Sequence, residues 1–284
     1  MKALSNRVAV ITGAASGIGK GIAQQLAKEG MKLVLADIEE RSLAETQREL
    51  RAAGAETLSV VTDVSQREAV FTLADRAFAT FGHIHILCNN AGVSGGLGPV
   101  WKIPPQDWEW IMAVNFYGIL YGIQAFVPRM IEDNEEGVII NTTSVVGLTT
   151  GTTSAYGITK HAISRLTEGL QYDLQAAGSK LRAALLVPGA TATNILLSDR
   201  HRPQTLTAPM DETAHATLTE RRRVRHEQIQ QRGMKPTEAG AMVVQAIKDE
   251  RFYILVDPER TKRFVRLCME GILNETGSSP EAAV

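Results

Sequence analysis

The sequence predicts an α/β fold in which a parallel sheet of about seven strands is covered by helices on both faces. Short, continuously apolar runs alternate with longer stretches of helical spacing along the first two thirds of the 284 residues. Strands that are apolar at every position are typical of sheets buried on both faces. Right-handed crossovers wind such a sheet into the doubly wound, Rossmann-type arrangement. No Pro-, Gly- or Ser-rich linker divides the chain, so we expect residues 1–284 to form a single domain.

The elements follow one another in an alternating order. Residues 39–53, for example, are rich in Glu, Arg, Leu and Ala, which all favour helices. The predicted strands are Val8–Thr12, Leu33–Asp37, Thr57–Val61, Ile84–Cys88, Val138–Thr142, Ala183–Val187 and Phe252–Val256. The main predicted helices are Gly17–Lys28, Glu39–Ala53, Gln66–Phe81, Thr237–Lys248 and Glu259–Leu273.

One segment, residues 195–234, breaks this alternation. It is polar, contains Pro203 and Pro209, and includes a run rich in arginine at 221–225. A helix over about 211–231 is predicted, with Asp211 as its N-cap. The arginine run is interpreted as a solvated helix face, the alternative being contact with an acidic substrate or a neighbouring subunit. The tail 274–284 is expected to be disordered.

Composition and charge narrow the possible partners and compartment. The 30 basic and 31 acidic residues give a formal net charge of −1, which argues against nucleic acid or an anionic membrane as the main partner. Cys88 and Cys268 lie far apart, outside any metal-ligand spacing. We therefore expect a reduced, cytoplasmic protein without a metal site. Neither a signal peptide nor an uninterrupted apolar run of about 18 residues is present, so no membrane span is expected.

A glycine-rich turn joins the first predicted strand to the first predicted helix. It reads Thr-Gly-Ala-Ala-Ser-Gly-Ile-Gly at positions 12–19. Glycines let the backbone approach a pyrophosphate closely, and the following helix presents free N–H groups to that anion. The alternative is a plain turn, but the position in the first βα unit favours a dinucleotide cofactor. The residues predicted to bind it here are Gly13, Ser16, Gly17, Ile18 and Gly19.

An acidic residue, Asp37, ends the second predicted strand and is followed by Ile38. A carboxylate at this position accepts hydrogen bonds from the adenosine ribose hydroxyls and repels a 2′-phosphate. No basic residue lies within the glycine-rich turn to bind such a phosphate. Asp37 therefore predicts NAD as the cofactor, the alternative being that this carboxylate only caps the next helix.

Two more groups of residues lie at predicted strand ends. Asp63 and Val64 follow the third strand, and Asn90, Ala91 and Gly92 follow the fourth. Open α/β sheets bind their ligands at these carboxyl ends, which favours a contact with the cofactor. The alternative for each group is an ordinary turn or helix cap.

Tyr156 and Lys160 are the strongest candidates for acid/base chemistry. Four residues apart in a helical stretch, they share one helix face, where an ammonium would lower the pKa of the phenol. The alternative is an aromatic core residue beside a surface lysine. Ser144 closes the fifth strand, and its hydroxyl would hold a substrate oxygen near Tyr156. The Asn115 amide lies in an apolar helical stretch, where it either is satisfied in the core or holds a water.

These motifs resemble those of the short-chain dehydrogenase/reductase family in its one-domain, NAD-dependent form. The resemblance covers residues 6–193 and resumes near Lys235. The motifs that agree in identity and order are residues 12–19, Asp63, residues 89–92, Asn115, Ser144, Tyr156 with Lys160, and Pro188 with Gly189.

The resemblance implies a catalytic role for four residues. Tyr156 would be the general acid/base, and Lys160 would lower its pKa and bind the nicotinamide ribose. Ser144 would orient the carbonyl or alcohol oxygen. Asn115 would support a water that relays protons from solvent to Lys160.

The resemblance also implies how the cofactor is held. Asp37 would bind the adenine ribose, Asp63 and Val64 the adenine, and Asn90 the floor of the cleft. The nicotinamide carboxamide would be held by the segment that contains Pro188, Gly189, Thr191 and Thr193.

The segment after Thr193 forms a lid over the substrate in this family, so residues 195–234 are expected to be a substrate-binding lid. Its length favours a bulky secondary alcohol. The ending, Phe252–Val256 with Pro258 and a final helix, gives a weaker similarity to lignin-type aryl alcohol (C-alpha) dehydrogenases. The resemblance alone implies a homodimer or homotetramer.

The leading hypothesis is an NAD-dependent oxidoreductase that moves a hydride between a bulky secondary alcohol, or its ketone, and the nicotinamide. One alternative keeps the enzyme class and makes the protein a ketone reductase that uses NADPH. Another is a protein that binds NAD as a sensor without turnover, which the fold by itself does not exclude.

Overall fold

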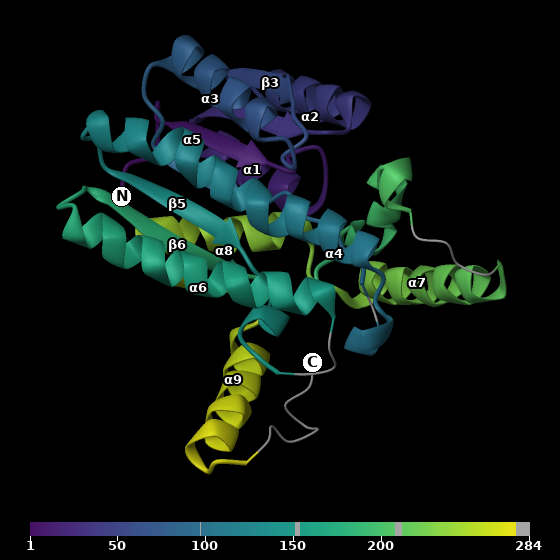
Figure 1. The fold of residues 1–284 in the computed structure, drawn as a ribbon. Helices are drawn as coiled ribbons and strands as arrows, with labels where there is room; N and C mark the ends of the chain where they lie inside the picture. Colours follow the sequence, from purple (N-terminus) through teal and green to yellow (C-terminus); the bar gives the residue numbers. More distant parts are fainter. Residues whose placement is uncertain (97, 151–153, 208–211, 277–284) are drawn as a thin grey trace.

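The computed structural model describes residues 1–96, 98–150, 154–207 and 212–276. Within these residues, seven parallel strands form one sheet in the order β3-β2-β1-β4-β5-β6-β7, as predicted (Figure 1). The strands are β1 (Val8–Thr12), β2 (Lys32–Asp37), β3 (Thr57–Val61), β4 (Ile86–Asn89), β5 (Gly137–Thr142), β6 (Leu181–Val187) and β7 (Tyr253–Leu255).

Helices cover both faces of the sheet because both faces of the central strands are apolar. In β1, Ala9 and Ile11 pack into one core cluster, whereas Val8 and Val10 pack into another. The first cluster includes side chains of α1 (Gly17–Lys28), α2 (Glu40–Ala52) and α8 (Pro236–Lys248). The second includes side chains of α3 (Arg67–Phe81), α5 (Gly118–Glu132) and α6 (Ala155–Ala176).

The helix that carries Asn115 is interrupted by a wide turn. A short α4 (Pro105–Ile111) continues through a π-helical segment, Met112–Tyr117, into α5 without a loop. Among the described residues, the whole stretch Pro105–Glu132 has the length and mean hydropathy of a membrane span. Half of the relevant 18-residue window is buried inside the fold, however, as in the core helix of a globular domain.

The inserted segment is largely helical, as predicted. After two 3₁₀ turns, Ile195–His201 and Gln204–Leu206, it forms α7 (Glu212–Arg232), which projects from the body in Figure 1. Thr191, shortly before the segment, forms a parallel bridge with Met234, its last residue. The segment therefore leaves and rejoins the domain at one place. The predicted N-cap Asp211 lies outside the described residues.

The arginine run of α7 is mostly solvated. Arg221, Arg223, Val224 and Arg225 are exposed, while Arg222 is half-buried and forms an ion pair with Asp199. The final helix, α9 (Pro258–Leu273), begins where the Asp257 carboxylate accepts a hydrogen bond from Arg260 N (3.3 Å). Of the tail expected to be disordered, residues 277–284 lie outside the described part of the chain.

Candidate active site

A cleft lies at the carboxyl edge of the sheet. The strand order reverses between β1 and β4, and in open α/β sheets ligands bind at such a switch point. The cleft is lined by residues that follow each of the first six strands, within the ranges 13–18, 37–39, 62–66, 90–93, 142–144 and 188–195. Sites predicted at separate strand ends are therefore brought together in one cavity.

The glycine-rich turn lies tightly against the loop after β4. Thr12 Oγ1 accepts hydrogen bonds from Asn90 N (2.9 Å) and Ala91 N (3.1 Å), and Asn90 Nδ2 donates to Thr12 O (3.0 Å). Gly13 has a positive φ of 68°. A Cβ at Gly19 would lie 2.1 Å from Gly13 O, so only glycine fits there. The turn thus leaves its backbone bare at the N-terminus of α1, which fits the pyrophosphate of a dinucleotide.

Asp37 joins the end of β2 to this turn. Its Oδ2 accepts a hydrogen bond from Ala15 N (2.9 Å), and its Oδ1 accepts one from Glu39 N (3.0 Å). Burial raises the pKa of Asp37, although the hydrogen bonds from these two N–H groups act in the opposite direction. Asp37 therefore both stabilises the local backbone and presents a carboxylate to the cleft, next to the half-exposed Ile38.

The residues after β3 combine a turn with a cleft wall. The Asp63 carboxylate accepts hydrogen bonds from Ser65 N (2.9 Å) and Ser65 Oγ (2.7 Å), so it stabilises the turn before α3. Val64 is buried and packs closely against Gly118 at the start of α5. Both residues also line the cleft, so the turn is observed and the contact with the cofactor stays a prediction.

Three of the four predicted catalytic residues, Ser144, Tyr156 and Lys160, line the same cleft, whereas Asn115 lies buried outside its lining. Ser154 caps α6 by accepting a hydrogen bond from Gly157 N (2.9 Å), which places Tyr156 in the first turn of the helix. Ser144, after β5, lies close enough to the Tyr156 hydroxyl to oppose the rise in its pKa. Lys160 is buried, its Nζ donates to Thr142 O (2.8 Å), and it lies 5.5 Å from the centre of the Tyr156 ring.

Burial shifts the pKa values of this pair in opposite directions. It raises the pKa of Tyr156 to about 12, with the hydrogen bond to Ser144 acting against the shift. It lowers the pKa of Lys160 to about 7 from an ordinary 10.5. Desolvation therefore outweighs the expected effect of the ammonium on the phenol, and Tyr156 is protonated at neutral pH.

Because the pKa of Lys160 is depressed in the folded protein, we expect the free energy of unfolding to depend on pH. Between about pH 7 and pH 10 the unfolded chain binds the proton that the folded protein releases, so stability rises with pH. In Lys160→Met this contribution is absent. From the 10.5-to-7 shift, we expect the free energy of unfolding of the unmodified protein, relative to the variant, to rise by about 3 kcal/mol over that range.

Urea unfolding of both proteins at the two pH values measures this difference. Lys28→Met, at an exposed position on α1, is the control. Its free energy of unfolding should rise with pH as much as that of the unmodified protein. An equal pH response in the unmodified protein and in Lys160→Met would contradict the depressed pKa.

Asn115 lies in the π-helical segment and is fully buried. Its Oδ1 accepts from Val93 N (2.8 Å), and its Nδ2 donates to Val93 O (3.0 Å) and to Thr159 Oγ1 (3.2 Å). The side chain therefore clamps the loop after β4 against α6. The side chain is thus a satisfied core amide, and its support of a water stays a prediction.

The segment after β6 completes the cleft. Val145 N donates to Pro188 O (3.1 Å), which joins this segment to the residues that follow β5. Thr193 packs against Gly17 of the glycine-rich turn, where an added Cβ would lie 3.1 Å from its methyl group. Thr191 is buried and donates to Gly189 O (3.3 Å). All four predicted residues, Pro188, Gly189, Thr191 and Thr193, line the cleft.

Several cleft residues were missed in the sequence. Thr12 does not line the cleft, but it organises the turn after β4, a role that its place in the motif of residues 12–19 did not reveal. Glu39, Arg200 and His201 line the cleft, but Arg200 and Glu39 are 161 positions apart and carried no local signal. The apolar wall formed by Val93, Trp110, Pro203, Leu206 and Ile229 was likewise not identified.

The fold and the cleft define a dinucleotide-binding α/β protein. The family described as short chain dehydrogenase matches residues 7–204, and the chain belongs to this family. It is therefore an oxidoreductase that acts on alcohol groups.

Known proteins resemble the chain over most of its length. The crystal structure of a short chain dehydrogenase/reductase from Burkholderia phymatum in complex with NAD matches with a TM-score of 0.91 and 39% identity over 98% of each chain. The 3beta-hydroxysteroid dehydrogenase 2 of Eggerthella lenta is 39% identical over 193 residues, which are 68% of this chain and 74% of that protein.

A third relative bears on the weaker similarity found in the sequence. The C alpha-dehydrogenase of Sphingobium sp. is 30% identical over 260 residues, which are 91% of this chain and 83% of that protein. The weaker similarity to C-alpha dehydrogenases that was predicted from the sequence is thus confirmed.

Proposed function

We propose that the protein is an NAD-dependent dehydrogenase that interconverts a bulky secondary alcohol and its ketone, with Ser144, Tyr156 and Lys160 as catalytic residues. One observation carries this proposal. Ser144, Tyr156 and the buried Lys160 line the same cleft as a glycine turn too tight for any other residue at position 19. Chemistry and cofactor binding are thereby assigned to one cavity.

The residues act on the alcohol in a defined order. When bound, the nicotinamide would accept a hydride from the carbinol carbon, or return one to the ketone. Ser144 Oγ orients the substrate oxygen toward the Tyr156 hydroxyl. In the direction of oxidation Tyr156 takes the hydroxyl proton, and in reduction it donates that proton. Lys160, when protonated, favours the phenolate by its charge.

The raised pKa of Tyr156 sets the direction of the pH dependence. Oxidation needs the phenolate, and the phenol pKa of about 12 leaves little of it at neutral pH. The rate of alcohol oxidation should therefore increase as the pH is raised from neutral to alkaline values, whereas ketone reduction uses the protonated phenol and needs no such rise.

NAD is proposed as the cofactor because of Asp37. Its carboxylate faces the cleft beside the glycine turn and would accept hydrogen bonds from ribose hydroxyls while repelling a 2′-phosphate. The related Burkholderia phymatum protein has NAD bound. Ketone reduction with NADPH is the competing function.

A substitution at Asp37 separates the two cofactors. Asp37→Asn keeps an acceptor for Ala15 N and removes the charge, so the preference for NAD over NADP in kcat/KM should fall by about tenfold to a hundredfold. Asp37→Ala, which also removes the acceptor, should weaken the use of both cofactors. A preference for NADP in the unmodified protein would refute the choice of NAD.

A bulky substrate is proposed from the wall of the cleft. Val93, Trp110, Leu206 and Ile229 come from the loop after β4, from α4 and from the inserted segment, and they give the cleft an apolar wall. Relatives named hydroxysteroid dehydrogenase and C alpha-dehydrogenase support the same class. A panel of steroid, aryl, terpenoid and short secondary alcohols, followed by NADH absorbance, tests it, and turnover confined to short alcohols would overturn it.

The proposal also covers the domain organisation and the assembly of the protein. Residues 195–234 would act as the substrate lid of a single domain, and the protein would assemble as a homodimer or homotetramer. Light scattering during size-exclusion chromatography measures the assembly, and a monomeric mass would contradict it.

A further inference from the structure

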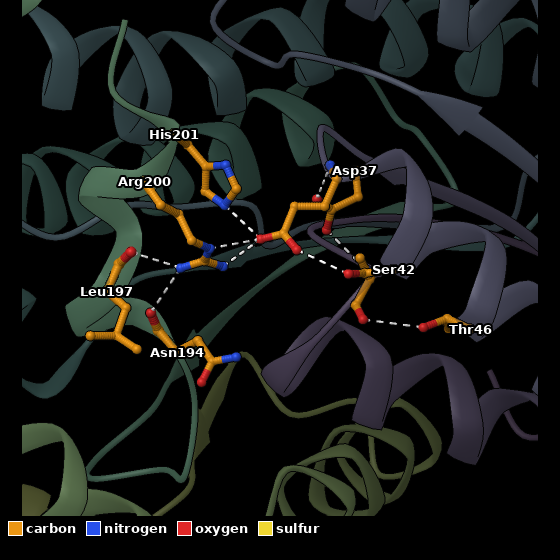
Figure 2. Close-up of polar contacts among 9 residues, drawn as sticks. Asp37, Ser42, Thr46, Asn194, Leu197, Arg200 and His201 are labelled. Atoms are coloured by element: carbon orange, nitrogen blue, oxygen red, sulfur yellow. Dashed lines mark hydrogen bonds and ion pairs between the residues drawn. The ribbon is translucent and has the colours of Figure 1, made fainter.

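An acidic side chain beside Asp37 binds an arginine and a histidine of the inserted segment. Glu39, immediately before α2, accepts hydrogen bonds at Oε1 from Arg200 Nε (3.0 Å) and from His201 Nε2 (2.6 Å). Arg200 Nη2 contacts the same oxygen, and Ser42 Oγ donates to Glu39 Oε2 (3.0 Å). Figure 2 shows Arg200 and His201 reaching across from the inserted segment toward the Asp37 end of the cleft.

The remaining face of the Arg200 guanidinium is also occupied. Its Nη1 donates to Leu197 O (2.8 Å) and, more weakly, to Asn194 O (3.5 Å). Arg200 is thus held between its own segment and a single carboxylate. Burial opposes the ionisation of Glu39, but the hydrogen bonds and charge of Arg200 lower its pKa overall, so the carboxylate is charged at neutral pH.

The position of this cluster matters for cofactor choice. Glu39, Arg200 and His201 line the same cleft as Asp37, at the end proposed to hold the adenosine ribose. An arginine and a histidine at this end are the residue types that bind a 2′-phosphate. Both side chains are hydrogen-bonded to Glu39, so a phosphate there would meet two carboxylates and an arginine and a histidine that are already paired.

We propose that Glu39 is a second specificity-determining residue, which excludes a 2′-phosphorylated cofactor by sequestering Arg200 and His201. Asp37 acts by direct repulsion, and Glu39 acts by occupying the arginine and histidine donors that a 2′-phosphate would otherwise bind. This inference rests on the proposed placement of the adenosine ribose beside Asp37. It also predicts that Asp37 substitution alone leaves much of the discrimination intact, because specificity has both an attractive and a repulsive part.

The test uses ligands without a nicotinamide, so that its result does not depend on turnover. Isothermal titration calorimetry would measure 5′-AMP and adenosine 2′,5′-bisphosphate binding to four proteins, all in the Asp37→Asn background. They are the background itself, Glu39→Ala, Arg200→Ala, and Glu39→Ala combined with Arg200→Ala.

Releasing Arg200 and His201 from Glu39 should improve the binding of adenosine 2′,5′-bisphosphate but not that of 5′-AMP. Glu39→Ala is expected to raise affinity for adenosine 2′,5′-bisphosphate about tenfold and to leave that for 5′-AMP unchanged. Adding Arg200→Ala should abolish most of this gain. A full gain that persists without Arg200 would mean that release of Arg200 is not its cause, and no gain would mean that Glu39 does not determine specificity; either result overturns the proposal.

The same titrations separate this inference from the proposed function. Tight binding of 5′-AMP together with no turnover of any alcohol would refute the proposed dehydrogenase activity. The role of Glu39 would then still be tested by the affinity for adenosine 2′,5′-bisphosphate. Failure of all four proteins to bind 5′-AMP would overturn the placement of the adenosine site and with it the inference.

Discussion

Tyr156→Phe is expected to lower kcat for alcohol oxidation by about a thousandfold or more, within or above the range usual for loss of a general acid/base. Phenylalanine keeps the ring that packs beside Lys160 but removes the hydroxyl that would exchange a proton with the substrate. The cleft keeps its glycine turn and Asp37, so the dissociation constant for NAD should change by no more than about threefold.

The control for this prediction lies on the same helix. Tyr172 is 70% exposed on α6 and takes no part in the cleft, so Tyr172→Phe should keep full activity. Stopped-flow turnover and NAD titration by protein fluorescence measure both constants. Full turnover in Tyr156→Phe would refute the mechanism, whereas equal loss of NAD binding and turnover would show that the hydroxyl serves binding instead.

Gly19→Ala is the second substitution with a large expected effect. The added methyl group would lie 2.1 Å from Gly13 O and 2.7 Å from Asn90 Nδ2, and neither the backbone oxygen nor the hydrogen-bonded amide yields easily. Overpacking of this kind costs about 1–3 kcal/mol of stability. Because the shifted atoms form the dinucleotide cradle, affinity for NAD should fall by at least about a hundredfold.

Gly169→Ala provides the matched comparison. Its Cβ would meet only Arg165 Nη1, at an ordinary 3.6 Å, in the middle of α6. Alanine favours helix by about 1 kcal/mol over glycine, so this variant should be slightly more stable and bind NAD normally. If Gly19→Ala binds NAD as tightly as Gly169→Ala, the turn does not hold the pyrophosphate.

The sheet could be predicted from the sequence because its central strands are nearly continuous apolar runs. β1, for example, reads Val-Ala-Val-Ile-Thr and is buried throughout. Residues that follow such strands meet at one edge, so the convergence of Asp37, Asn90 and Ser144 followed once the strands were known to be parallel.

Other features depend on contacts that no local pattern encodes. Glu39 and Arg200 are 161 positions apart, and their meeting depends on the path of the inserted segment. The sequence also left the state of Asn115 open, since a buried amide shows its partners, Val93 and Thr159, only in three dimensions. The pKa of Tyr156 was expected to fall, but burial proved to be the larger influence.

The π-helical segment Met112–Tyr117 has a consequence for how this chain tolerates insertions and deletions. A wide turn accommodates an extra residue relative to an α-helix, so the face of α4 is offset from that of α5. Deleting one residue there would restore regular winding and rotate α4 by about 100° relative to α5. Gly118 would stay against Val64, while Trp110 would turn out of its buried place in the cleft wall. A change of one residue in length could thereby redraw the substrate pocket while the sheet and the cofactor cradle stay as they are.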